Sequence, residues 1–126
     1  MKKILIVDDD VDIVDLLENR LKMNNYEVTF TNDGDNGIKK ALLQKPDLII
    51  MDVMMPRMSG GEAAKLLKAN EITKNIPILF FTAMNTYLPP GAELNHINVD
   101  GQNYPAITKP FEPVKLLSTI KSMLGE

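Results

Sequence analysis

The sequence predicts an α/β fold, a doubly wound five-stranded parallel sheet with helices on both faces. Three short apolar runs, at residues 4–7, 48–51 and 78–81, support this fold, and weaker strand signals lie at 28–31 and 106–108. Strands that are apolar along their whole length need cover on both faces, and segments of helical period alternate with them here. Such an alternation is typical of a parallel sheet between two helical layers.

Apolar residues at helical spacing predict four helices, which begin near Ile13, Asp35, Ser59 and Pro113. The second helix is expected to end before Pro46, because a proline disfavours helical geometry at the residue that precedes it. Ser59 and Glu62 form a capping-box pattern at the start of the third helix. Pro113 suits the first turn of the last one, since its missing N–H group would have no partner there.

The segment from Met84 to Pro105 breaks this alternation. It contains Pro89-Pro90-Gly91, scattered asparagines and Asp100-Gly101, with no sustained apolar period. A further helix is therefore expected to be short, around Ala92 to Ile97, or irregular or absent. Residues 1–126 are expected to form one domain.

Composition narrows the classes of function. A net charge of -3 and a pI of about 5.2 leave no positive excess for binding nucleic acid or an anionic membrane. No stretch approaches the roughly 18 apolar residues of a membrane span, so we expect a cytoplasmic protein without membrane insertion. The chain has no cysteine and a single histidine, His96. Any metal would therefore be bound mainly by oxygen.

Polar residues follow the apolar runs of the predicted sheet: Asp8, Asp9, Asp52, Thr82 and Lys109. The carboxyl ends of parallel strands lie along one edge of a sheet, so these residues are expected to converge. Three carboxylates in one crevice repel one another unless a cation compensates, and oxygen ligands alone favour Mg²⁺. Asp52 ends the most apolar strand and is the best-placed nucleophile for attack on phosphorus, which would form an acyl phosphate.

Four ordered motifs in this sequence resemble the receiver domain of two-component response regulators. They are Ile6-Val7-Asp8-Asp9-Asp10, Met51 to Gly60, Phe81-Thr82-Ala83 and Thr108 to Glu112. The resemblance covers nearly the whole chain, apart from the stretch between Ala83 and Ala106. It implies a flavodoxin-like strand order, 2-1-3-4-5, and a receiver domain of chemotaxis or relay type over residues 1–126.

The resemblance implies a metal site and a phosphoacceptor. Asp52 would take the phosphoryl group. Asp9 and Asp52 would coordinate Mg²⁺ directly, Asp8 would act through water, and the backbone carbonyl group of Met54 would be a further ligand.

The resemblance also implies how the phosphoryl group is held and exchanged. Lys109 would pair with one phosphoryl oxygen, the hydroxyl group of Thr82 would hydrogen-bond another, and Pro110 occupies the family's cis-peptide position. The donor would be a histidine kinase or a phosphotransfer protein. Output would pass through contacts with a downstream protein, because no output domain is expected after Leu124.

The sequence departs from the family pattern at the switch position and in the stretch from Thr82 to Lys109, which is longer than the family norm. Ala106 stands where the family has an aromatic switch residue. We expect either that Tyr104 partly substitutes for it, if the strand extends that far on the same face, or that switching runs through the altered loop. Met54 and Met84 are bulky and apolar at positions that modulate the attack of water in the family, which predicts slow self-dephosphorylation.

Two other functions are compatible with the sequence. One is a degenerate receiver that binds partners without phosphorylation. The other is a Mg²⁺-dependent phosphohydrolase with an aspartate nucleophile, although haloacid-dehalogenase-like phosphatases place this residue after the first strand and need a substrate cap. The complete set of site residues favours a phosphoacceptor whose only reactions are its own phosphorylation and dephosphorylation.

Overall fold

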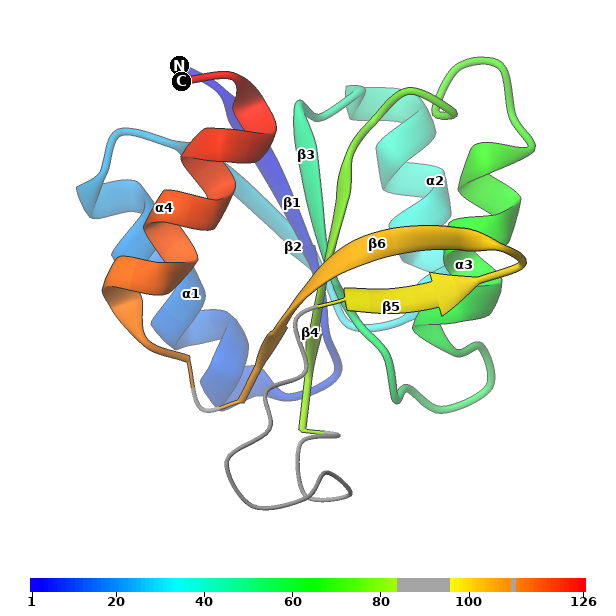
Figure 1. The fold of residues 1–126 in the computed structure, drawn as a ribbon, viewed down its shortest axis with the longest axis horizontal. Helices are drawn as coiled ribbons and strands as arrows, with labels where there is room; N and C mark the ends of the chain where they lie inside the picture. The colour runs from blue at the N-terminus through cyan, green and yellow to red at the C-terminus, as the bar shows by residue number, and fades with distance from the viewer. Residues whose placement is uncertain (84–95, 110) are drawn as a thin grey trace.

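A single six-stranded sheet organises the chain, with helices on both of its faces (Figure 1). The computed structural model describes residues 1–83, 96–109 and 111–126. The strands are β1 (Lys3–Val7), β2 (Glu27–Thr31), β3 (Leu48–Asp52), β4 (Ile78–Thr82), β5 (His96–Val99) and β6 (Gln102–Thr108). The helices are α1 (Val11–Met23), α2 (Gly34–Gln44), α3 (Gly60–Lys68) and α4 (Pro113–Leu124).

The strand order is β2-β1-β3-β4-β6-β5. All neighbours from β2 to β6 are parallel, and β5 is antiparallel to β6. Since β6 is the fifth parallel strand, the predicted order of the parallel sheet is confirmed, and β5 is added at its edge.

The helices cover the two faces as the apolar strands require. On β1, Ile4 and Ile6 belong to the core beneath α1 and α4, while Leu5 and Val7 belong to the core beneath α2 and α3. Successive side chains of a strand point to opposite faces, so a strand buried on both sides is apolar at every position.

Side chains that precede the first turns define where the helices begin. Asp10 accepts hydrogen bonds from the backbone N–H groups of Asp12 and Ile13, and Ser59 accepts one from that of Glu62 at 3.2 Å. These bonds satisfy donors that have no partner within the helix. Among the described residues, no helix is long and apolar enough to cross a membrane.

The described part of the segment between β4 and α4 forms a β-hairpin, β5 and β6, not a helix. The strand expected over 106–108 begins earlier, at Gln102, and residues 96 and 97 of the expected short helix lie in β5. The remainder of that expected helix falls on residues 84–95, outside the described residues. Asp100 and Gly101 join the two strands with φ values of 51° and 83°, and positive φ at both central residues is what a two-residue type I′ turn requires.

Packing against α3 holds this hairpin in place, and Figure 1 shows it crossing in front of that helix. Ile97 and Val99 are packed against the core beneath α2 and α3. The ring of Tyr104 is buried and meets Phe80 edge to face, with centroids 5.4 Å apart. The hairpin thus extends the sheet beside α3.

We expect replacement of Gly101 by alanine to lower the free energy of unfolding by about 1 kcal/mol, because a Cβ atom disfavours its positive φ. Urea unfolding of the two proteins measures this change. Gly61→Ala is the matched control, since a Cβ there would make only ordinary contacts at 3.8 Å and alanine favours a helix. Equal losses in the two variants would contradict a strained turn.

Candidate functional site

The carboxyl ends of neighbouring strands bring the predicted site residues to one edge of the sheet. Asp8 follows β1, Asp52 ends β3, Thr82 ends β4 and Lys109 follows β6. These four strands are consecutive neighbours in the sheet. The backbone N–H group of Lys109 donates to the carbonyl oxygen of Thr82 at 2.7 Å, which ties the last two strand ends together.

Three carboxylates meet at this edge. Asp8, Asp9 and Asp52 each offer an oxygen atom, and these atoms lie within 4.8 Å of one another. Asp8 and Asp52 are 2% and 5% exposed, whereas Asp9 is exposed to solvent. The carboxylate cluster is therefore buried at Asp8 and Asp52 and accessible to solvent at Asp9.

Among the described residues, one lysine forms ion pairs with the two buried carboxylates. The Nζ atom of Lys109 lies 3.0 Å from Oδ2 of Asp8 and 3.6 Å from Oδ2 of Asp52. It also lies 5.6 Å from the centre of the Phe81 ring, within the range of a cation–π contact. Its side chain is 15% exposed, so its charge is poorly screened by water.

One positive charge does not balance the carboxylates, and Asp52 shows the result. Burial, reinforced by the charge of Asp8, raises the pKa of Asp52 to about 7. Lys109 and the backbone N–H group of Met54, which donates to Oδ1 of Asp52 at 3.3 Å, act in the opposite direction. The site therefore lacks positive charge at neutral pH.

The donor set fits a divalent cation such as Mg²⁺. All three converging side chains offer hard oxygen ligands, which Mg²⁺ prefers. Within the described part of the chain, Oδ2 of Asp8 is buried with no hydrogen bond of acceptable geometry, although Lys109 is near enough for an ion pair. Both features leave room for a further cation.

The loop after Asp52 is held by close backbone contacts that no sequence pattern predicts. A Cβ atom on Gly60 would overlap the carbonyl oxygen of Asp52, and the N–H group of Gly60 donates to the carbonyl oxygen of Val53 at 2.9 Å. Arg57 has a φ of 69°. The sequence indicates Gly60 only as a member of the Met51 to Gly60 motif. Its closeness to the Asp52 carbonyl group cannot be derived from the sequence, because it depends on how the loop turns back.

Tyr104 and Ala106 occupy the same face of β6, since both are buried in the core beneath α2 and α3. The strand does extend as far as Tyr104. The Nζ atom of Lys68 lies 5.8 Å from the centre of the Tyr104 ring. Whether Tyr104 replaces the missing aromatic residue stays a prediction.

The structure describes two of the four remaining predicted residues, Thr82 and Met54. Thr82 is fully buried at the end of β4, and Met54 is 70% exposed beside Asp52. Met84 and Pro110 lie outside the described residues.

The pKa of Asp52 predicts how stability depends on pH in the metal-free protein. Its value of about 7 lies above the ordinary aspartate value near 4, so the folded protein binds more protons than the unfolded chain between these pH values. The free energy of unfolding should therefore fall as pH rises through this window, by at most about 1.4 kcal/mol per pH unit from this group.

Urea unfolding of the native chain and Asp52→Asn, with EDTA, measures the difference because the other groups titrate in both proteins. We expect Asp52→Asn to be the more stable protein at about pH 7.5, where the native carboxylate is charged. Parallel stability profiles in the two proteins would contradict a raised pKa.

Comparison with known sequences gives a family match over most of the chain. The model of the response regulator receiver domain matches residues 4–121. The alkaline phosphatase synthesis transcriptional regulatory protein PhoP of Bacillus subtilis is 37% identical over 98% of this chain and 48% of its own length. The phosphate regulon transcriptional regulatory protein PhoB of Pseudomonas aeruginosa is 38% identical over 98% of this chain and 52% of its own. The chain spans about half the length of these relatives.

Solved structures share the fold over nearly the whole chain. The chemotaxis response regulator CheY4 of Vibrio cholerae has a TM-score of 0.81 and 32% identity, covering 98% of both chains. The receiver domain of the sensor histidine kinase PA1611 of Pseudomonas aeruginosa has a TM-score of 0.81 and 26% identity, covering 99% of this chain and 98% of its own. That structure holds a magnesium ion in its active site cleft.

Receiver domains are typically signalling modules rather than enzymes, and they partner histidine kinases. The acidic triad of this chain resembles the receiver magnesium site. With the family match over residues 4–121, the chain belongs to the response regulator receiver domain family, and its pocket of Asp8, Asp9 and Asp52 is of the kind typical of phosphoacceptor sites.

Proposed function

We propose that this domain is the phosphoacceptor of a two-component or phosphorelay system, in which Asp52 takes a phosphoryl group from a phosphohistidine donor in a Mg²⁺-dependent transfer. The observation that carries this proposal is the meeting of three carboxylates and one lysine at the sheet edge. Asp52 is buried there with Lys109 at 3.6 Å and with Asp8 and Asp9 close by. Lys109, together with a divalent ion held by these carboxylates, would offset the negative charge of a transferring phosphoryl group.

In the proposed transfer, a carboxylate oxygen of Asp52 attacks phosphorus. A bond from this oxygen to phosphorus forms while the bond from phosphorus to the donor's imidazole nitrogen breaks, and the nitrogen keeps the electron pair. The nucleophile must be ionised, and the raised pKa of Asp52 makes this depend on added positive charge. Lys109 supplies one such charge from within the chain.

The proposed metal ligands are Asp9 and Asp52 directly, Asp8 through water and the backbone carbonyl group of Met54. When bound, a divalent ion supplies positive charge that offsets the charge on the phosphoryl oxygens. The exposure of Asp9 leaves a path from solvent to this group. Burial of Asp8 keeps its carboxylate in place, where its Oδ1 accepts a hydrogen bond from the N–H group of Asp10 at 2.9 Å.

Two further groups complete the proposed phosphoryl pocket. Lys109 would exchange part of its contact with Asp8 for a phosphoryl oxygen, since its Nζ atom already lies between the two buried carboxylates. The Thr82 hydroxyl group would donate to another oxygen from the end of β4. Ala83 follows with a small side chain that leaves space for the group.

The proposed partners are a histidine kinase or phosphotransfer protein as donor and a downstream protein as receiver of the signal. Output through protein contacts is favoured over direct contact with nucleic acid by the net charge of -3. Tyr104 is the proposed substitute for the aromatic switch residue that Ala106 replaces. Its contact with Phe80, two residues before Thr82, supports this role.

Incubation with acetyl phosphate and Mg²⁺ tests the proposed acceptor. The intact mass of the native chain should rise by one phosphoryl group, and that of Asp52→Asn should not. Asp35→Asn, which changes an exposed aspartate of α2, is the matched control and should be modified like the native chain. EDTA should abolish modification in both.

Two results would contradict this proposal. Absence of any adduct would favour a phosphorylation-independent binding module. Repeated turnover of phosphate esters would favour a phosphohydrolase.

Met54 should make the phosphorylated protein slow to lose its phosphoryl group. Its side chain is apolar and 70% exposed beside Asp52, so it offers no polar group to orient an attacking water. We expect Met54→Asn to speed the loss of phosphate by about tenfold, below the range of full general-base catalysis. Met54→Leu keeps an apolar side chain and should decay like the native protein. Equal or slower decay in Met54→Asn would contradict this role.

A further inference from the structure

The strand β2 leaves one of its edges open among the described residues, since it pairs only with β1. Glu27 donates its N–H group to Lys2, and Thr31 accepts from Asp8, so the odd-numbered residues of β2 bond toward β1. Alternate residues of a strand direct their backbone groups to opposite sides. Val28 and Phe30 therefore direct theirs away from the sheet.

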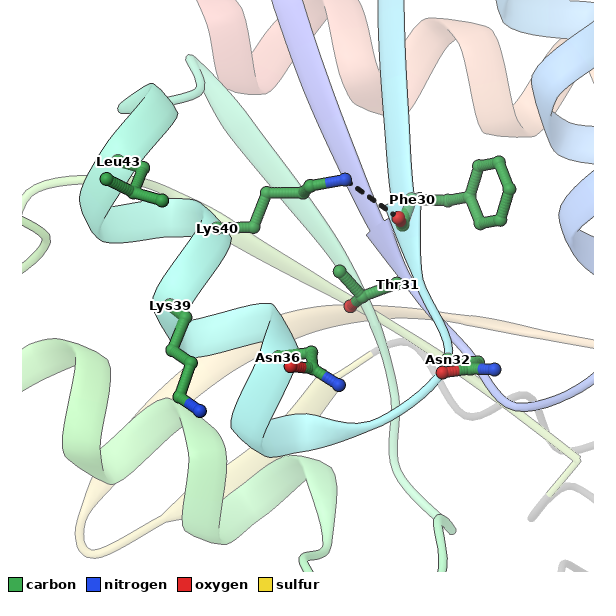
Figure 2. Close-up of a pocket in the computed structure, with 7 residues that line it drawn as sticks. All are labelled: Phe30, Thr31, Asn32, Asn36, Lys39, Lys40 and Leu43. Carbon is green, nitrogen blue, oxygen red and sulfur yellow. Dashed lines mark hydrogen bonds between the residues drawn. The ribbon is translucent and has the colours of Figure 1, made fainter.

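A groove of about 380 Å³ runs between this edge and α2, and Figure 2 shows its lining. The residues that line it are Phe30, Thr31, Asn32, Asn36, Lys39, Lys40 and Leu43. Lys40 crosses from α2 to the carbonyl oxygen of Phe30, at 3.4 Å. This distance is at the long end for a hydrogen bond, so an incoming N–H group can replace the lysine at little cost.

The two sides of the β2 edge differ in chemistry. On the α2 side the groove carries Lys39 and Lys40 and no acidic residue, in a chain of net charge -3. The Phe30 ring points away from α2 and is 50% exposed. A strand laid along this edge would present alternate side chains to the lysines and to the ring.

We propose that the β2 edge binds an extended segment of another protein in which acidic and apolar residues alternate. The segment adds a strand to the sheet through the backbone groups of Val28 and Phe30. Its acidic side chains meet Lys40, which already reaches the β2 edge, and its apolar side chains meet Phe30. This surface is separate from the acidic site and does not depend on phosphorylation of Asp52.

The same lysines decide against a second copy of this chain as the occupant. Pairing two β2 edges would bring the lysines of both copies to one groove, where like charges repel. Lysine beside a sheet edge is a common guard against unwanted strand pairing. Here the same lysine would attract an added strand that carries acidic side chains.

A pair of synthetic peptides tests the proposal against the 126-residue chain labelled with ¹⁵N. One peptide alternates glutamate and valine over about eight residues, the length of a longer strand. The other has the same composition with all glutamates before all valines. With the alternating peptide we expect saturable shifts of the amide resonances of Val28 and Phe30, and with the second peptide we expect none.

A charge-reversed variant tests whether Lys40 contributes to binding of the alternating peptide. Lys40→Glu should weaken binding of the alternating peptide by at least about tenfold, because it places like charges in the groove. Lys121→Glu, an exposed lysine of α4 outside the groove, is the matched control and should bind like the native chain. Asp52→Asn should also bind normally, which separates this surface from the acceptor site.

Three results would overturn the proposal. The first is no shift at Val28 and Phe30 with the alternating peptide. The second is the same shift with both peptides, which would mean simple attraction of charge. The third is the same shift with a single-stranded oligonucleotide, which would mean a general polyanion site.

Discussion

Asp8 and Asp52 are almost completely buried beside each other, with one lysine to offset them. Buried carboxylates are costly unless they are paired, and the raised pKa of Asp52 expresses that cost. The site is therefore built to gain stability when positive charge or a bound cation is supplied. A divalent ion would offset this excess of negative charge.

The sheet makes this arrangement possible because it fixes where the strands end. Asp52 ends the central strand β3, between β1 and β4, and the β6 end follows on the far side of β4. The loop after Asp52 then turns back so closely that Gly60 has no room for a side chain beside the Asp52 carbonyl group. The geometry of the site therefore depends on the packing of the sheet, since a shift of β3 would move the Asp52 carboxylate.

A β-hairpin, formed by β5 and β6, precedes Lys109 of the acidic site. The strand β6 runs without interruption from the turn at Gly101 to Thr108, next to Lys109. Tyr104 anchors the strand to Phe80 of β4, and Lys65 of α3 pairs with Asp100 at 3.2 Å. The hairpin is thus continuous with the strand that leads directly to the lysine of the acidic site.

The sequence by itself determined the parallel fold and the set of residues at its carboxyl edge. Apolar runs and helix caps are local signals, and a polar residue after each buried strand, such as Asp52 after residues 48–51, is visible without coordinates. Even the hairpin has a local signal, because the Asp100-Gly101 pair is typical of a two-residue hairpin turn as well as of a loop.

Only the tertiary structure decided how those signals combine. The hairpin forms because Ile97 and Tyr104 find an apolar surface on α3 and Phe80, far away in sequence. The pKa of Asp52 depends on burial and on Asp8, and the reach of Lys109 depends on the pairing of β4 with β6. These are long-range contacts, whose energies arise only when distant segments pack together, so no local pattern in the chain encodes them.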